Sequence, residues 1–274
     1  MSSILEESLS TYSLQIKEHI EKNKEYLDFF LVNKDNSYAQ LYLGIMYEYG
    51  YHVGKNYEEA LRFYNKSADQ NNSQAQNCLG DMYYFGLGVA RDYSEAINWY
   101  KISVVQHNSE AQHNLGFMYE MGRGIDQDYR EAIKWYKLAA RQNCSESQFC
   151  LGLMYENGMG TEINYDESIE WYKLSAEQNN IDSMNNIGDI YLKKYKNNIE
   201  ALKWFKLSAD NGSEYGSKKY DSYLTSSAEE LYKLYIDQQK EIDNLKKYIN
   251  HLETMPGSEL YKQAMDEFYE LAST

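Results

Sequence analysis

Five glycines at a constant spacing of 36 residues constrain the fold of this chain more than any other feature of its sequence. Each is preceded by leucine or isoleucine and followed three residues later by tyrosine. The five are Gly44, Gly80, Gly116, Gly152 and Gly188. A fixed period of this length indicates one supersecondary unit that is copied along the chain, because such a unit must stack on its neighbours to bury its apolar face.

Other residue types repeat in the same register. A second glycine column contains Gly50, Gly86, Gly122 and Gly158, and a third contains Gly88, Gly124 and Gly160. All four tryptophans, Trp99, Trp135, Trp171 and Trp204, share one column beside a column of tyrosines. Their even spacing and the alanines nearby favour a core between repeats over a platform for stacking a ligand.

Residues 109–144 illustrate the structure expected for one unit. Ala111, Leu115 and Met118 follow helical spacing and predict a first helix, helix A, with an apolar face. Gly122 predicts its end, because glycine enters the left-handed conformation of a helix C-cap without steric cost. Asp128 is the expected N-cap of a second helix, helix B. The unit is therefore an antiparallel helical hairpin, and the fold class is all-α.

The column pattern, written AQHNLGFMYEMGRGIDQDYREAIKWYKLAA in the third unit, closely resembles the Sel-1-like repeat, a relative of the tetratricopeptide repeat. The resemblance implies a right-handed α/α superhelical solenoid of helix-turn-helix repeats that serves as a non-catalytic scaffold or adaptor for protein complexes. Such proteins act in endoplasmic-reticulum quality control, in bacterial signalling and host interaction, and in large DNA viruses. The predicted repeats are residues 37–72, 73–108, 109–144, 145–180 and 181–212.

Three departures from the pattern are visible. His52 replaces a turn glycine in the first unit, and the fifth unit is three residues short, so a tighter turn and a bend are expected there. Secreted relatives rich in cysteine place disulfides between helices at regular positions, whereas Cys78, Cys144 and Cys150 do not follow that scheme.

The ends are expected to cap the solenoid. Residues 1–36 are predicted to form an N-terminal cap, in which residues 24–36 align with a helix B. Residues 213–274 are predicted to contain a degenerate sixth repeat, a long helix after a capping box at Ser226 and Glu229, and a final helix after Pro256. A heptad seam runs through Leu231, Tyr235, Gln238, Ile242, Leu245, Ile249 and Leu252. Two alternatives are open for residues 226–274: an intramolecular helical hairpin, or a short coiled coil that forms a weak homodimer.

The composition of the chain limits the classes of binding partner that are expected. The chain has 27 basic and 42 acidic residues, a formal net charge of −15, which argues against nucleic acid and anionic membranes and favours a protein or peptide of basic or mixed charge. No apolar run is long enough to span a membrane, and the odd number of cysteines suits a reducing compartment. We expect a cytoplasmic protein. Abundant Asn, Tyr and Lys suggest an AT-rich genome, and thus a host cytoplasm if the source is an intracellular bacterium or a large virus.

No sequence motif indicates a catalytic site, a cofactor site or a metal site. The five histidines are scattered, and no motif for zinc, phosphate or a serine nucleophile is present. The Gly-x-Gly strings recur every 36 residues and therefore indicate turns, not a dinucleotide site. Asn114 and Asn186 are expected to be buried side chains that bond to the backbone of a neighbouring loop.

Partner specificity is expected from helix A positions that share one face and vary between units. These are the columns of residues 41, 45 and 48, and in tetratricopeptide-like superhelices helix A lines the concave surface. The predicted contact residues are Leu41, Ile45, Asn77, Asp81, Tyr84, His113, Phe117, Glu120, Phe149, Leu153, Glu156, Asn185 and Asp189. Phe117, Phe149 and Leu153 are the expected apolar anchors. The alternative is that this stripe packs against adjacent helices. A competing function is self-assembly through the terminal helices, with the repeats as a spacer.

Overall fold

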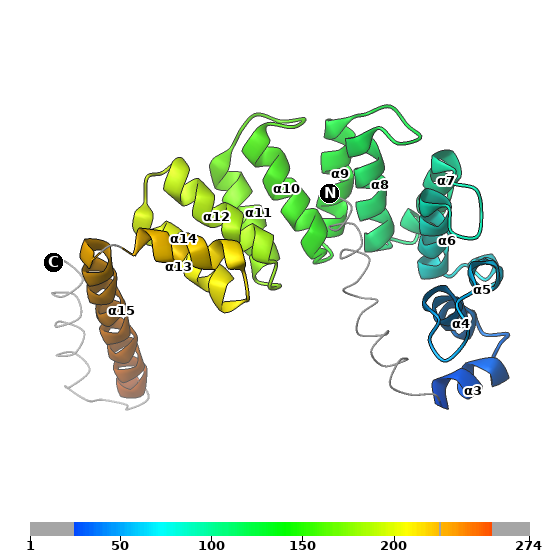
Figure 1. The fold of residues 1–274 in the computed structure, drawn as a ribbon, viewed down its shortest axis with the longest axis horizontal. Helices are drawn as coiled ribbons and strands as arrows, with labels where there is room; N and C mark the ends of the chain where they lie inside the picture. The colour runs from blue at the N-terminus through cyan, green and yellow to red at the C-terminus, as the bar shows by residue number, and fades with distance from the viewer. Residues whose placement is uncertain (1–24, 225, 254–274) are drawn as a thin grey trace. The chain divides into compact units, whose positions relative to one another are not determined.

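The computed structural model describes residues 25–224 and 226–253, and within these ranges every regular element is an α-helix. This confirms the prediction of an all-α fold. The chain divides into two compact units after Ile190. The first contains helices α3 to α11 and most of α12, and the second contains the rest of the chain (Figure 1).

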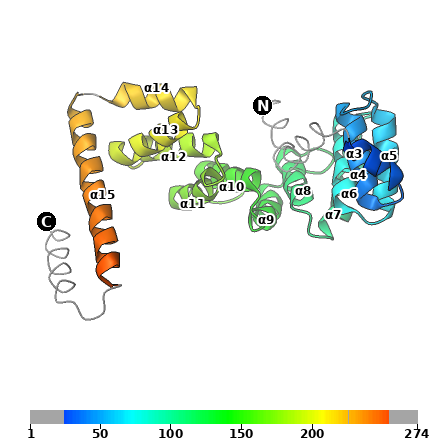
Figure 2. The same cartoon turned by 90° about the horizontal axis from the view of Figure 1, so that it is seen from below.

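The first unit consists of stacked helical hairpins. In the first four hairpins an A helix packs against the following B helix, and α5, α7 and α9 also pack against the next A helix, as Figure 2 shows for α10 between α9 and α11. The helices are α4 (Ser37–Tyr49), α5 (Tyr57–Asp69), α6 (Ser73–Phe85), α7 (Tyr93–Val104), α8 (Ser109–Met121), α9 (Tyr129–Ala140), α10 (Ser145–Asn157), α11 (Tyr165–Ala176) and α12 (Ile181–Lys193). The predicted solenoid of helical hairpins is therefore confirmed, whereas the handedness of its superhelix stays a prediction.

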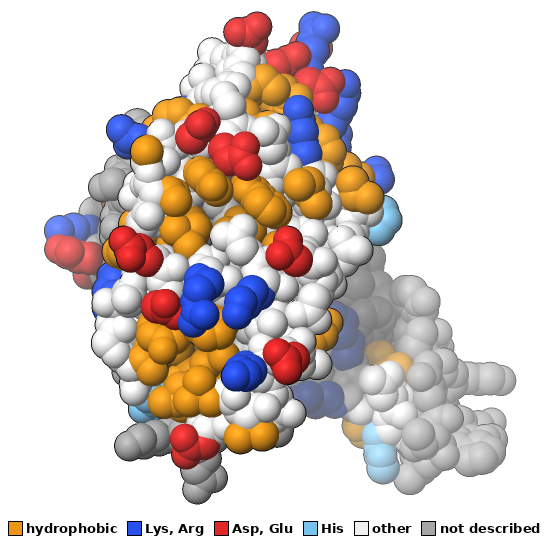
Figure 3. All heavy atoms as spheres, turned by 90° about the vertical axis from the view of Figure 1, so that its right-hand side faces the viewer, with side chains coloured by type: hydrophobic (Ala, Val, Ile, Leu, Met, Phe, Trp, Pro, Cys, Tyr) orange, Lys and Arg blue, Asp and Glu red, His pale blue; other side chains and the backbone are white. Residues whose placement is uncertain are grey.

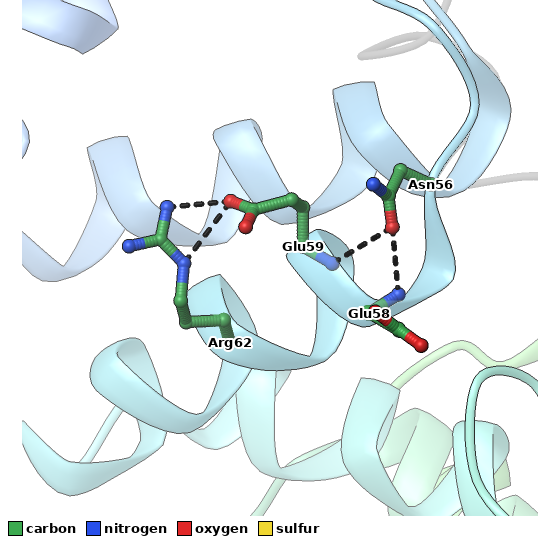
Figure 4. Close-up of polar contacts among 4 residues, drawn as sticks. All are labelled: Asn56, Glu58, Glu59 and Arg62. Atoms are coloured by element: carbon green, nitrogen blue, oxygen red, sulfur yellow. Dashed lines mark hydrogen bonds and ion pairs between the residues drawn. The ribbon is translucent and has the colours of Figure 1, made fainter.

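Short polar side chains cap the start of most helices in the first unit. The Asn56 side-chain oxygen accepts hydrogen bonds from the backbone N–H groups of Glu58 (3.0 Å) and Glu59 (3.1 Å) at the start of α5 (Figure 4). Asp128 caps α9 in the same way, as predicted, with bonds of 2.9 and 3.1 Å to the N–H groups of Arg130 and Glu131. Each cap satisfies backbone donors that the first helical turn leaves without partners.

Helix A ends where the glycine columns predict. The C-caps of α4, α6, α8 and α10 are Gly50, Gly86, Gly122 and Gly158, all with positive φ. His52 also has positive φ (56°), as expected for its place in the turn. A further left-handed position between repeats was not predicted. It is occupied by Asn71, His107, Asn143, Asn179 and Gly212. Asparagine tolerates this conformation because its short side chain bonds locally.

The first glycine column exists because a tyrosine ring of helix B lies against the backbone of helix A. A Cβ atom added at Gly80 would lie 2.3 Å from the Tyr100 ring, and one at Gly116 would lie 2.8 Å from the Tyr136 ring. Both tyrosines are buried. Glycine therefore sets the close approach of the two helices.

The third glycine column serves contacts between repeats. A Cβ atom at Gly124 would lie 2.7 Å from Cβ of Tyr93 in the preceding repeat, and the same collision recurs between Gly160 and Tyr129. The tryptophan column also joins neighbours, since Trp171 packs against a core cluster that contains Ile133 of α9. The tryptophans are half-buried, and their predicted core role is confirmed for the first unit.

At the N-terminal end, α3 (Glu25–Val32) lies where a helix B was predicted, and Phe30 stacks on Tyr42 of α4 with ring centroids 4.9 Å apart. Hydrophobic side chains gather in patches among charged ones over this end of the unit (Figure 3). Residues 1–24 of the predicted N-terminal cap lie outside the described residues.

The second unit contains α13 (Asn198–Asp210), α14 (Glu214–Tyr223) and α15 (Ser226–Glu253). The turn before α13 is only four residues long, residues 194–197, compared with seven, residues 122–128, before α9, so the tighter turn of the fifth repeat is confirmed. In α15, Tyr232 meets Tyr220 of α14, and Tyr235 accepts a hydrogen bond from Lys203 of α13. Pro256 and the final helix predicted after it lie beyond the part of the chain that the structure describes.

Candidate binding surface on the A helices

The predicted contact stripe lies partly in the core and partly at the surface. Six of its residues are buried: Leu41, Ile45, Asn77, Tyr84, His113 and Asn185. The other seven are half-buried: Asp81, Phe117, Glu120, Phe149, Leu153, Glu156 and Asp189. The surface available to a partner is therefore narrower than the predicted stripe.

In the third and fourth repeats, the side chain in the column of residue 41 lies against the buried tyrosine of helix B in the same hairpin. The His113 ring lies 5.3 Å from the Tyr136 ring, and the Phe149 ring lies 5.8 Å from the Tyr172 ring. The His113 Nδ1 atom is 2.9 Å from the Ser147 hydroxyl, and burial lowers the pKa of the imidazole. These side chains shield buried rings, so part of the stripe packs as the alternative interpretation expected.

A tyrosine of helix B donates a hydrogen bond to a carboxylate of helix A in each of the first four repeats. In three repeats the acceptor is a glutamate of the residue 48 column, as in the bonds from Tyr136 to Glu120 (2.6 Å) and from Tyr172 to Glu156 (2.8 Å). In the second repeat Tyr84 occupies that column, and Tyr100 donates instead to Asp81, one turn earlier, at 2.7 Å. The periodicity placed these residues on facing helices, but it did not identify the bond.

Asp81 is the centre of a polar network between successive A helices. The Asn114 amide of α8 donates to Asp81 Oδ1 (3.1 Å) and to the Asn77 side-chain oxygen (3.0 Å). Asn114 is half-buried and bonds to side chains, so the prediction that it bonds to loop backbone was wrong. The physical reason is that α6 and α8 bring polar side chains of the same face within reach of each other.

Burial raises the pKa of two of these carboxyl groups. Desolvation raises the pKa of Asp81 well above its ordinary value, against the lowering effect of the Tyr100 hydrogen bond, and it also raises the pKa of Glu120. Among the described residues, no lysine, arginine or histidine forms an ion pair with Asp81, Glu120 or Glu156. Within the described part of the chain, Asp81, Glu120 and Glu156 therefore have hydroxyl partners and no cation partner.

Arg123, which sequence reasoning missed, marks an aromatic cluster at the same surface. Its guanidinium carbon lies 5.4 Å from the centroid of the Tyr84 ring, 5.6 Å from that of Phe117 and 5.9 Å from that of Tyr93. The corresponding positions in the second and fourth repeats hold Leu87 and Met159, which pack on core clusters. The sequence feature that could have identified Arg123 is that the other interior repeats hold apolar residues in its column.

Two other kinds of site receive no support. In the described parts of the chain, no group of three or more His, Cys, Asp or Glu residues is placed to hold a metal ion. The three cysteines are free. Among helices α3 to α15, none combines the length and the apolar character that crossing a membrane requires.

Comparison with known proteins assigns the family. The Sel1 repeat profile matches residues 37–72, 73–103, 109–144, 145–180 and 181–213. Among solved structures, c5321, a protective antigen of uropathogenic Escherichia coli with an SLR fold, is 34% identical with a TM-score of 0.65 over 71% of this chain, which spans 42% of that protein. A Sel1 repeat protein from Oxalobacter formigenes is 28% identical with a TM-score of 0.69. That alignment covers 83% of this chain and 99% of the other.

A more distant structure, a putative Sel1 repeat protein from Klebsiella pneumoniae, shares the fold at 20% identity with a TM-score of 0.51, over 74% of this chain and 99% of that protein. No curated protein matches the chain. Sel1 repeat proteins are generally scaffolds for protein interaction and are generally not catalytic. The match over five consecutive units, together with hairpins that repeat in the same register, places this chain in the Sel1 repeat family.

Proposed function

We propose that this chain is a non-catalytic scaffold or adaptor that holds a protein or peptide segment against the half-buried residues of its A helices. The contact residues would be Asp81, Phe117, Glu120, Phe149, Leu153, Glu156 and Asp189. The columns of these residues are not uniform along the chain, since that of residue 117 holds Ile45, Asp81, Phe117, Leu153 and Asp189 in the five repeats. Variable residues on a regular framework are where a repeat protein adapts to its partner.

The observation that carries this proposal is that Asp81, Glu120 and Glu156 lie on one face, each bonded to a tyrosine hydroxyl and none paired with a cation among the described residues. A carboxylate that is partly desolvated gains more from a nearby cation than one in open water, because the local dielectric constant is lower. A partner segment that presents Lys or Arg beside an apolar residue therefore fits this surface best, with Phe117 and Phe149 as anchors.

The test is selection of ligands from a random library of linear peptides displayed on phage. We expect the selected peptides to be enriched in Lys and Arg. Binding, measured by fluorescence anisotropy, should weaken at least tenfold with the double variant Phe117→Ala/Phe149→Ala. It should also weaken severalfold with Glu120→Gln, which keeps an acceptor for Tyr136 but removes the charge.

Glu162→Gln is the matched control, since it removes one negative charge from an exposed position in the turn before α11. It should leave peptide affinity unchanged. If Glu162→Gln and Glu120→Gln weaken peptide binding equally, the effect comes from the net charge of the chain. That result would contradict binding at the A-helix surface. A large fall in melting temperature of the double phenylalanine variant would assign both rings to the core.

We also propose the domain limits given by the sequence: a cap at residues 1–36, repeats at 37–212 and a C-terminal region at 213–274. The free cysteines support a reducing, cytoplasmic location. For residues 226–274 we favour the intramolecular alternative, because Tyr232 and Tyr235 contact α14 and α13 of the same chain.

A further inference from the structure

The outer surface of the B helices carries an apolar stripe that belongs to neither the core nor the A-helix surface. Ile102, Leu138 and Leu174 recur every 36 residues, and they are 45%, 41% and 43% exposed. Their equal exposure shows that each occupies the same place in its repeat. Lys66 holds this position in the first repeat, so the stripe is confined to the later repeats.

The helices that carry Leu138 and Leu174, α9 and α11, are successive B helices, and α10 packs against both. Trp171 of α11 packs against a cluster that includes Ile133 and Tyr136 of α9. Because both helices have the same register within their repeats, their outer faces point to the same side. Leu138 and Leu174 therefore lie at equivalent positions on the two outer faces, and we call this pair the apolar centre.

The charges around this centre are opposite on the two helices. Residues 129–141 contain four basic residues and one acidic residue, whereas residues 165–177 contain one basic residue and four acidic ones. Lys134 and Arg141 flank Leu138, and the corresponding residues that flank Leu174 are Glu170 and Glu177. All four are exposed. Equivalent positions in adjacent repeats thus carry opposite signs.

We propose that this surface binds a second copy of the same chain through a two-fold contact. A two-fold axis between α9 and α11 places the basic α9 of one copy against the acidic α11 of the other, and by symmetry the reverse pair forms as well. Leu138 and Leu174 then meet Leu174 and Leu138 of the second copy. A self-complementary patch, basic on one half and acidic on the other, is what an isologous interface requires.

The contact is expected to be weak because its area is small. Salt should weaken it further, because it joins exposed charges of opposite sign. Two helix faces bury less than the ~1,200 Å² typical of stable interfaces. The net charge of −15 on each copy also opposes association over long range. Self-association at high protein concentration is the expected behaviour, and it is independent of the proposed peptide binding.

The experiment uses two charge-reversed forms of the full chain and analytical ultracentrifugation. The first form is Lys134→Glu/Arg141→Glu, in which both helices are acidic; the second is Glu170→Lys/Glu177→Lys, in which both are basic. Each form alone should associate at least tenfold more weakly than the wild type, because like charges face each other. An equimolar mixture should form a heterodimer at least as tight as the wild-type dimer, because every α9–α11 contact then joins opposite charges.

Arg62→Glu is the matched control. Arg62 occupies the column of Lys134 in the first repeat and, like Lys134, forms an ion pair with a glutamate three residues earlier (Figure 4). This variant should associate like the wild type. Circular dichroism of each reversed form establishes that it is folded. A wild-type chain that stays monomeric at millimolar concentration, or a mixture that does not associate, would overturn the proposal. Loss of association in Ile242→Asp/Leu245→Asp, with none in the reversed forms, would assign self-association to the heptad seam of α15 instead.

Discussion

The second and third repeats meet the same hydrogen-bonding requirement with different residues. In the third repeat the buried Tyr136 donates to Glu120, and Phe117 occupies the position one turn earlier. In the second repeat Tyr84 replaces the glutamate, and Asp81 replaces the phenylalanine and accepts the bond from Tyr100. The acceptor has moved by one helical turn, whereas the tyrosine has kept its place.

The difference teaches that the buried hydroxyl needs an acceptor but does not fix which position supplies it. A buried hydroxyl without a partner costs about 1–3 kcal/mol. The fifth repeat has Phe205 in the tyrosine column and Leu192 in the glutamate column, so donor and acceptor are both lost there. Tyr84 itself is buried, and its hydroxyl makes no hydrogen bond with the described residues.

The largest effect is expected where the two repeats agree, at the glycine beneath the tyrosine ring. Gly80→Ala should destabilise the chain by about 3 kcal/mol and Gly116→Ala by less, because the added Cβ atoms would lie 2.3 and 2.8 Å from the two rings. Urea unfolding measures both. Gly54→Ala is the control, since its Cβ atom meets nothing within 4 Å. Equal costs at all three sites would show that the rings do not set the helix spacing.

Replacing the acceptor residues of the second repeat with those of the third tests directly whether the acceptor can move by one helical turn. Asp81→Phe leaves the Tyr100 hydroxyl without its acceptor and should cost about 2 kcal/mol. Adding Tyr84→Glu reproduces the residues of the third repeat and should recover at least half of that loss. A double-mutant cycle with the two single variants measures the coupling. A coupling near zero would mean that the acceptor cannot move between these positions.

The pH dependence separates the two carboxyl positions further. The pKa of Asp81 is raised in the folded chain, so above pH 3.8, its ordinary value, the unfolded chain releases the proton first and Asp81 opposes folding. Asp81→Asn removes this penalty and still offers an oxygen to Tyr100. The variant should gain stability over the wild type as the pH rises from about 4 to 7, with no gain below pH 3.8. Chemical unfolding across this range provides the measurement, and Glu162→Gln controls for net charge.

The smallest effect concerns Arg123, which covers Tyr84 of the second repeat from the turn of the third. Arg123→Leu introduces the residue type of the second repeat and should cost about 0.5–1 kcal/mol, the usual value of a cation–π contact near the surface. Arg123→Lys should recover part of it. A stabilised leucine variant would indicate that packing outweighs the charge at this position.

Periodicity was sufficient for the hairpins, the helix ends at the glycine columns and the core role of the tryptophans, because backbone conformation and close packing limit which residues fit. Periodicity was not sufficient to predict which side chains of the variable face are exposed or which of them contact one another. Leu41 and Tyr84 share the variable face with Phe117 yet are buried, since neighbouring helices cover them. The Asp81 network and the Arg123 cluster depend on which side chains meet across repeats, and a repeat pattern averages such differences away.

The collision that any side chain at Gly124 would make with Tyr93 means that each turn is shaped to the repeat before it. The first repeat has His52 at this position, and the fifth has no glycine there. Interior units can therefore be duplicated or lost whole during evolution while the terminal ones stay in place. Adding or removing a whole 36-residue unit would therefore preserve these contacts, whereas a change of another size inside the first unit would break them.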